Sequence, residues 1–248
     1  MSGEFLFFLI AGAIAGGFVN GLAGFGTALF TLGWWLQILP PVEAVGLVLV
    51  MSVVSGLQGM VLVWRSIDWR RLAVFLVPAL IGIPVGLQIL SFIDATTLKI
   101  LVATALLTYG GYFSLRRSIP TVNRQTPMID GSVGFLGGIL GAIGGLSGAL
   151  LTMWCAIKPW TKTETRAVLQ TYNMTVLTLA ALGLFIDGKY QKESLLSMVI
   201  MLPVAMVSTQ AGIMTYKRMS DSQFRRLLIV LMFLSGIIII LREAWVLF

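Results

Sequence analysis

Two glycine-rich segments of the chain carry small polar side chains of the kind that could bind a ligand. Their candidate positions are Asn20, Gly24, Gly26, Thr27, Gly145, Ser147 and Gly148. A helix that starts directly after such a glycine cluster points its free N-terminal amides and its partial positive charge at the turn. Hydroxyl and amide groups beside these helix starts can donate hydrogen bonds to the oxygens of an anion. The pattern favours a site for a small anion, although helix caps and hydrogen bonds between helices use the same residue types.

Further polar residues recur within otherwise apolar sequence. Ser52, Ser55 and Gln58 are three residues apart, and Gln170 and Asn173 lie in the corresponding region of the second half. Polar side chains at membrane depth usually face the interior of a helix bundle. These residues could line a transport pathway or hold helices together, and the sequence leaves both interpretations open. We select Ser52, Gln170 and Asn173 as binding candidates.

The residue types that the chain lacks exclude several classes of enzyme. The sequence has no histidine and Cys155 is its only cysteine, so the chain cannot build a Ser-His-Asp triad, an internal disulfide or a cysteine-based zinc site. Glu43 and Glu164 are the only acids that match between the two halves of the chain. Thr161, three residues before Glu164, predicts a capping box there rather than proton transfer. We therefore expect a protein that is not an enzyme and that holds no cofactor or metal.

The composition indicates a membrane protein. Of the 248 residues, 58% are hydrophobic and only 11% are charged, against about 45–50% and about 25% in an ordinary soluble domain. A chain of this length cannot bury so much apolar surface in one core, so lipid must be its main solvent. We interpret the formal net charge of +7 as the positive-inside bias of a membrane protein and expect no nucleic-acid partner.

The elements that must position the polar residues are therefore membrane helices. Six apolar blocks have close to the roughly 20 residues that cross a bilayer. They are Val42–Trp64, Leu72–Phe92, Leu98–Leu115, Thr165–Ile186, Leu195–Tyr216 and Leu227–Leu247. Two longer blocks, Phe5–Leu39 and Gly131–Ile157, contain the glycine clusters.

The distribution of lysine and arginine favours glycine-rich blocks that enter and leave the membrane on the same side. If every block crosses once, the 17 basic residues divide nine to eight between the two sides. With two re-entrant blocks, thirteen basic residues, Arg166 among them, share one side and four lie on the other. That asymmetry is typical of cytoplasm against exterior. We expect arms of about 11 to 13 residues whose tips meet near mid-membrane; two full crossings per block would give the same loop charges.

The two halves of the chain also resemble each other. Residues 28–31, ALFT, match residues 149–152, ALLT, at an offset of 121, which also pairs Gly24 with Gly145. We predict an all-α polytopic membrane protein with two inverted repeats, residues 1–120 and 121–248. Each repeat would hold a glycine-broken re-entrant helix pair plus three transmembrane helices. Glycines spaced four and three residues apart in the second block would equally provide a smooth face for close helix packing.

On these motifs the chain resembles the sulfite exporter TauE/SafE family, also called the toluene sulfonate uptake permease family. The resemblance rests on residues 17–26, GFVNGLAGFG, and on residues 137–148, GGILGAIGGLSG. Family members typically show a glycine triplet and then a proline after the first motif, whereas this chain has Gly26, Thr27 and Ala28 and no proline before Pro40. The resemblance implies transport of sulfur-containing anions such as sulfite, sulfoacetate or other organosulfonates.

Together these observations predict a carrier in the bacterial inner membrane that exports a small sulfur-containing anion by alternating access, driven by the membrane potential. An uptake permease coupled to protons or Na⁺ is the first alternative, and a non-transporting assembly subunit is the second. The expected partners are the anion and the lipid bilayer. The sequence leaves open whether the protein forms a homodimer.

Overall fold

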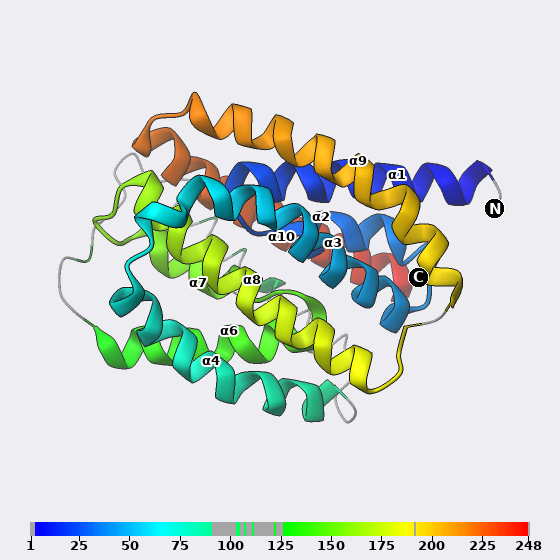
Figure 1. Ribbon diagram of the computed structural model, residues 1–248, viewed down its shortest axis with the longest axis horizontal. Helices are drawn as coiled ribbons and strands as arrows, with labels where there is room; N and C mark the ends of the chain where they lie inside the picture. Colours follow the sequence, from blue (N-terminus) through cyan, green and yellow to red (C-terminus); the bar gives the residue numbers. More distant parts are fainter. Residues whose placement is uncertain are drawn as a thin grey trace.

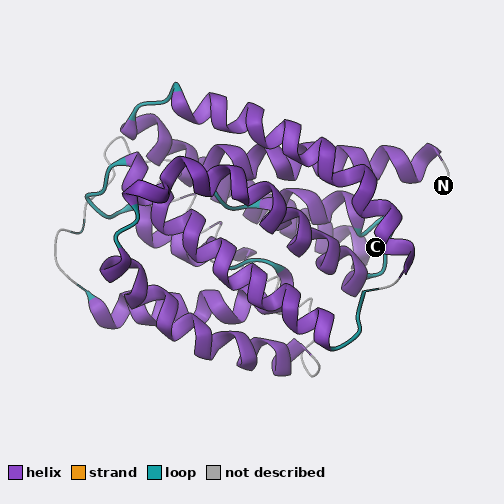
Figure 2. Cartoon of the chain, in the orientation of Figure 1, coloured by secondary structure: helices purple, strands orange, loops and turns teal. Residues whose placement is uncertain are grey.

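The computed structural model describes residues 3–90, 103, 104, 107, 111, 122, 126–190 and 192–247, and the regular structure in these ranges is entirely helical (Figure 2). Five long helices are α3 (Pro41–Val63), α4 (Trp69–Leu90), α8 (Lys162–Ile186), α9 (Lys192–Lys217) and α10 (Asp221–Leu247). A 3-10 helix, η1 (Trp64–Ser66), follows α3. The glycine clusters belong to two helix pairs, α1 (Gly3–Ala23) with α2 (Thr27–Trp35) and α6 (Pro127–Gly144) with α7 (Gly148–Ala156).

Six of the described helices are long and apolar enough to cross a membrane, namely α1, α3, α4, α6, α8 and α9. Of the predicted spanning blocks, four correspond to α3, α4, α8 and α9, and α10 covers a fifth. The predicted block Leu98–Leu115 lies outside the described residues apart from isolated positions. Large apolar side chains such as Val61, Ile81 and Phe185 are exposed on these helices, as a lipid-facing surface requires. Across its described residues the chain is an all-helical membrane protein.

Each glycine-rich block folds into a helical hairpin. In the first hairpin the indole N–H of Trp35, the last residue of α2, donates to the carbonyl of Leu9 over 3.0 Å, so α2 runs back along α1. In the second hairpin the indole N–H of Trp154, near the end of α7, donates to the Asp130 carboxylate near the start of α6. Each hairpin therefore begins and ends at the same end of the bundle.

The arms of these hairpins are unequal, which the sequence pattern does not predict. α1 has 21 residues and α6 has 18, whereas α2 and α7 have nine each. The expectation of arms of about 11 to 13 residues is wrong because the helices continue through most of their glycines. α1 and α6 stop at glycines with a positive φ, Gly24 (82°) and Gly145 (70°), and Gly26 (91°) directly precedes α2. Side chains disfavour that conformation, and glycine allows it.

The helical glycines let long helices pack closely. A Cβ atom on Gly17 would lie 2.6 Å from the carbonyl oxygen of Ala205, and one on Gly138 would lie 2.5 Å from that of Ala79. Only glycine permits backbones to approach so closely. Accordingly, α1 lies beside α9 and α4 lies beside α6 (Figure 1). The packing interpretation thus holds for the helical glycines, and the turn interpretation holds for those with positive φ.

The two hairpins match each other in the positions of their turns and in the length of their short arms. α1 and α6 end 121 residues apart, at Ala23 and Gly144, and α2 and α7 likewise start 121 residues apart. The close contacts repeat as well, since Gly17 and Gly138 have the same separation and both touch an alanine carbonyl. In both contacts the long hairpin helix of one half packs on a long helix of the other half.

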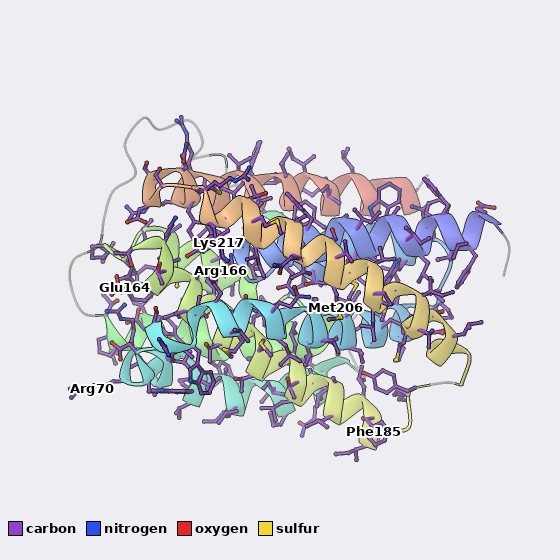
Figure 3. The ribbon with its side chains drawn as sticks, turned by 45° about the horizontal axis from the view of Figure 1, so that its top comes forward. Arg70, Glu164, Arg166, Phe185, Met206 and Lys217 are labelled. Atoms are coloured by element: carbon purple, nitrogen blue, oxygen red, sulfur yellow. The ribbon has the colours of Figure 1, made fainter. Side chains whose placement is uncertain are left out.

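The two ends of the bundle are chemically different. Figure 3 places Arg70 and Glu164 at one end and Phe185 at the opposite end. At the first end Arg71 forms an ion pair of 3.0 Å with Glu164. The predicted capping box is confirmed, because the Thr161 amide donates to the Glu164 carboxylate over 2.9 Å and the Glu164 amide donates to the Thr161 hydroxyl over 3.2 Å. We call this the basic end; its cations include Arg70, Arg71, Lys158, Lys162 and Arg225.

Candidate binding site

The turns of the two hairpins touch each other inside the bundle. We call residues 24–27 the first tip and residues 145–148 the second tip. A Cβ atom on Gly148 would lie 2.7 Å from the Cβ of Phe25, and one on Gly145 would lie 3.1 Å from the Cβ of Ala28. Phe25 is 1% exposed. The structure thus brings the two glycine motifs of the sequence into one buried region.

Asn20 lies one helical turn before the first tip and ties α1 to α3. Its amide nitrogen donates to the Ser55 hydroxyl over 2.8 Å and to the Ser52 carbonyl over 3.3 Å. The Ser52 hydroxyl itself donates to the Val48 carbonyl over 2.7 Å, within its own helix. The side-chain oxygen of Asn20 is buried without a hydrogen-bond partner. Asn20 therefore keeps an unsatisfied acceptor, whereas the donor of the Ser52 hydroxyl is satisfied.

Thr27 is the first residue of α2 and belongs to the first tip. Its side chain is 1% exposed, and its hydroxyl has no hydrogen-bond partner. Gly26, the N-cap residue, has no side chain with which to cap the helix. The first amides of a helix have no acceptor within it. The start of α2 therefore offers a hydroxyl donor and backbone amides that no side chain caps.

Helix α8 presents a polar face to the first tip. Arg166, Gln170 and Asn173 are spaced four and three residues apart and so share one face of the helix. A Cβ atom on Gly24 would lie 2.9 Å from the side-chain oxygen of Gln170 and 3.6 Å from the Cγ of Arg166. The Gln170 amide nitrogen donates to the Gly56 carbonyl over 3.1 Å, while its oxygen is buried without a partner. Unsatisfied polar atoms thus gather around the first tip.

The second tip has different surroundings. The Ser147 hydroxyl donates a short hydrogen bond to the side-chain oxygen of Asn173. Ser147 is the N-cap residue of α7, but its side chain makes no capping bond. A Cβ atom on Gly145 would lie 3.7 Å from Leu49 and 3.8 Å from Val48. The second tip is therefore tied to α8 by a hydrogen bond and packed against apolar side chains of α3.

The position of Arg166 in the sequence predicts a loop charge, and that prediction is wrong. Its side chain is 0% exposed, and it lies between the ribbons in Figure 3. Its terminal nitrogens donate to the carbonyls of Gly21 over 2.6 Å and Leu22 over 2.9 Å, at the C-terminal end of α1. Its guanidinium carbon lies 4.2 Å from the centre of the Tyr216 ring. The spacing of Arg166 from the two polar residues already selected on α8 is the signal that could have identified it.

A separate cavity of about 490 Å³ opens at the basic end. Its charged lining residues are Asp68, Arg70, Arg71, Asp130 and Lys158. Lys158 forms an ion pair of 3.1 Å with Asp130, and Arg71 lies 3.7 Å from Asp68, so much of this charge is compensated locally. The cavity offers space for a small solute outside the buried polar region.

The chemistry available around the tips is that of binding. In the part of the chain that the structure describes, no three side chains of histidine, cysteine, aspartate or glutamate gather as a metal site requires. The buried polar atoms are those of hydroxyl, amide and guanidinium groups, which recognise a solute by hydrogen bonds and charge.

A comparison with known families supports this description. The family model described as "Sulfite exporter TauE/SafE" matches residues 8–239 of the chain. The matched region contains both tips, their neighbours on α3 and α8, and nearly all of the helices. A comparison with individual curated proteins gives no match. The chain belongs to the TauE/SafE sulfite exporter family of membrane transporters.

Proposed function

We propose that this protein carries a small sulfur-containing anion across the inner membrane of a bacterium by alternating access, and that it exports the anion. The family suggests the class of substrate. The observation that carries the proposal is the first tip, where the unpaired Thr27 hydroxyl and the start of α2 meet a polar face of α8 in an otherwise apolar protein. Polar groups buried in a membrane protein are expensive and usually mark the path of a substrate.

We infer that the hairpins are re-entrant and that the halves 1–120 and 121–248 are inverted repeats. α1 runs parallel to α9, toward the basic end, because Gly17 meets Ala205 and Gly21 meets Thr209. α6 runs away from the basic end, beside α4, so the two hairpins enter from opposite ends (Figure 1). Without the buried Arg166 the predicted loop charges divide twelve to four, and this asymmetry supports a cytoplasmic location for the basic end.

The proposed anion site comprises the two tips and the side chains around them. Its residues are Asn20, Gly24, Gly26, Thr27, Ser52, Gly145, Ser147, Gly148, Gln170 and Asn173. Donors to the anion are the Thr27 hydroxyl and the first amides of α2 and α7. The side chains other than glycine in this set are at most 3% exposed. In the proposed cycle this structure is a closed state, and transport requires opening toward each side in turn.

The membrane potential is sufficient to drive export. A monovalent anion gains about 2.3 kcal/mol per 100 mV when it leaves a negative interior. That free energy supports a concentration ratio of roughly fifty-fold, because about 1.4 kcal/mol corresponds to a factor of ten. Export needs no coupling ion, whereas accumulation inside the cell does.

Uptake coupled to a cation is the second candidate function, and one observation favours it. The unpaired side-chain oxygens of Asn20 and Gln170 are acceptors, because their amide nitrogens already donate to other groups. Carbonyl oxygens of this kind suit Na⁺ better than an anion. An assembly subunit without transport activity would explain the packing glycines but leaves these unpaired polar atoms without a purpose.

The test is flux through the purified chain in liposomes loaded with sulfite or sulfoacetate. We expect efflux of the anion from the negative compartment, at a rate that rises with the imposed potential. Liposomes loaded with the anion but made without the protein should show no efflux. Uphill uptake that requires an imposed Na⁺ or proton gradient would replace export with the second candidate. Absence of flux for every sulfur-containing anion tested, in protein that keeps its thermal unfolding transition, would refute transport by this chain alone.

A further inference from the structure

Arg166 carries a buried positive charge with no acidic partner. Its side chain is 0% exposed, and among the described residues no carboxylate forms an ion pair with it. Moving a cation out of water without a counter-charge is costly, and a charged residue inside a membrane protein is by default a functional candidate. The presence of a buried arginine at this position therefore requires an explanation beyond packing.

The backbone compensates only part of this charge. The carbonyls of Gly21 and Leu22 accept hydrogen bonds from its two terminal nitrogens, at the negative end of the α1 dipole. These bonds use two of the five N–H groups of the guanidinium, and its Nε is buried without a partner. The planar group therefore keeps donors that could bind two oxygens of a sulfite or sulfonate group side by side.

The matched region of the first half has no such residue. The positions 121 residues before Arg166 and Gln170 are Val45 and Leu49, and Leu49 packs against the second tip. If a cation were needed only to hold a hairpin turn in place, the second tip would need one too. The second tip is built without it, so a structural requirement of the turn does not account for Arg166.

We propose that Arg166 is the residue that binds the negative charge of the transported anion, at the first tip. This inference rests on the proposed function. α8 begins at the basic end with Lys162, so an anion arriving from that end reaches Arg166 one helical turn before Gln170. The carbonyls of Gly21 and Leu22 hold the guanidinium beside Gly24 while its remaining N–H groups await the anion.

The experiment compares three variants of the full-length purified protein, Arg166→Gln, Arg166→Lys and Arg225→Gln. Arg225 is a matched control, because it also donates to backbone carbonyls, those of Lys158 at 3.0 Å and Trp160 at 3.5 Å, but is only half-buried. Affinity for sulfite and for sulfoacetate is measured by calorimetry, and the melting temperature is measured without ligand on the same preparations.

We expect Arg166→Gln to lower the affinity for both anions by about a hundredfold or more, because a charge and two charge-assisted hydrogen bonds are lost. Its melting temperature without ligand should change little, because the removal of a buried charge offsets the loss of the hydrogen bonds to the carbonyls of Gly21 and Leu22. Arg166→Lys should recover part of the affinity, and Arg225→Gln should bind like the unmodified protein.

Two results would overturn the inference while leaving transport intact. One is unchanged affinity and flux in Arg166→Gln. The other is an affinity loss that appears only with a lower melting temperature and that Arg166→Lys does not relieve, which would make Arg166 a structural cap of α1. If the unmodified protein binds and moves neither anion, the proposed function itself fails, and the inference fails with it.

Discussion

At the first tip Gly24 faces Gln170 and Arg166 on α8, whereas at the second tip Gly145 faces Leu49 on α3. The backbone turns are alike, with φ of 82° at Gly24 and 70° at Gly145. Gln170 and Leu49 occupy matched positions, 121 residues apart. The two turns therefore have similar backbones, but the neighbours of Gly24 are polar and those of Gly145 are apolar.

The hydroxyl groups of the two tips differ in the same sense. Thr27 has an unpaired hydroxyl, whereas the Ser147 hydroxyl is already bound to Asn173. Two hairpins with matched backbone turns thus differ in the polar groups that surround them. We infer that the first tip holds most of the affinity for the anion and that the second tip mainly supports it.

The contrast between the two tips requires first that the two hairpins enter the membrane from opposite sides. We place single cysteines at the two hairpin mouths, Gln37→Cys and Pro159→Cys, in a Cys155→Ala background that removes the one native, buried thiol. An impermeant thiol reagent should label Gln37→Cys only from outside intact cells and Pro159→Cys only from the cytoplasmic side. Labelling of both positions from one side would refute the inverted arrangement and leave the tips without a common mid-membrane site.

The next largest effect on sulfite binding should come from substitution of the tip glycines. In Gly24→Leu the side chain would meet Gln170, where even a Cβ atom would lie 2.9 Å from its oxygen, so sulfite binding should fall below detection. Gly145→Leu should lower the melting temperature and weaken sulfite binding less than Gly24→Leu does, because its neighbours Ala28, Val48 and Leu49 are apolar. If Gly24→Leu does not fold, Gly24→Ala serves as the smaller test substitution. Normal binding by Gly24→Ala together with lost binding by Gly145→Leu would show that the second tip, not the first, holds most of the affinity.

A smaller effect should follow from removal of the unpaired hydroxyl at the first tip. Thr27→Val has nearly the same shape and loses one donor, so the affinity for sulfite should fall about ten- to a hundredfold. Its melting temperature without ligand should not fall, since the Thr27 hydroxyl has no partner to lose. Calorimetry and thermal unfolding on one preparation check both values. Normal affinity with reduced thermal stability would mean that this hydroxyl holds helices together.

Sequence patterns predicted the elements of this fold better than the surroundings of each residue. Apolar block length located α3, α4, α8 and α9 to within a few residues, because the hydrocarbon thickness fixes helix length. The same reasoning failed for the hairpin arms, since a glycine inside a helix remains helical when a neighbouring backbone packs on it, as at Gly17. Only the local φ separates a packing glycine from a turning one, and spacing alone does not encode φ.

The candidate site likewise contains parts that the sequence predicted and parts that it did not. The glycine motifs indicated where the tips would be, but Arg166 was missed because its sequence neighbours are the cations and caps of a helix start. Its burial is a tertiary property, produced by the C-terminal end of α1 arriving over the first turns of α8. For the polar stripe of Ser52 and Ser55 the sequence left two interpretations open, and the structure adds that both hydroxyls donate to carbonyls of their own helix.

The smallest effect on binding, and a measurable one on stability, should come from the second tip. Ser147→Ala leaves the Asn173 oxygen buried without its donor, which costs about 1–3 kcal/mol of unfolding free energy. We expect the melting temperature to fall, while the affinity for sulfite changes less than in Thr27→Val. Asn173→Leu and the double variant complete a double-mutant cycle, in which the two single losses of stability should not add, because both remove the same hydrogen bond. Additive losses would show that Ser147 and Asn173 act independently. A fall in affinity as large as that of Thr27→Val would show that the second tip binds the anion as strongly as the first, so that the polar asymmetry between the tips does not set affinity.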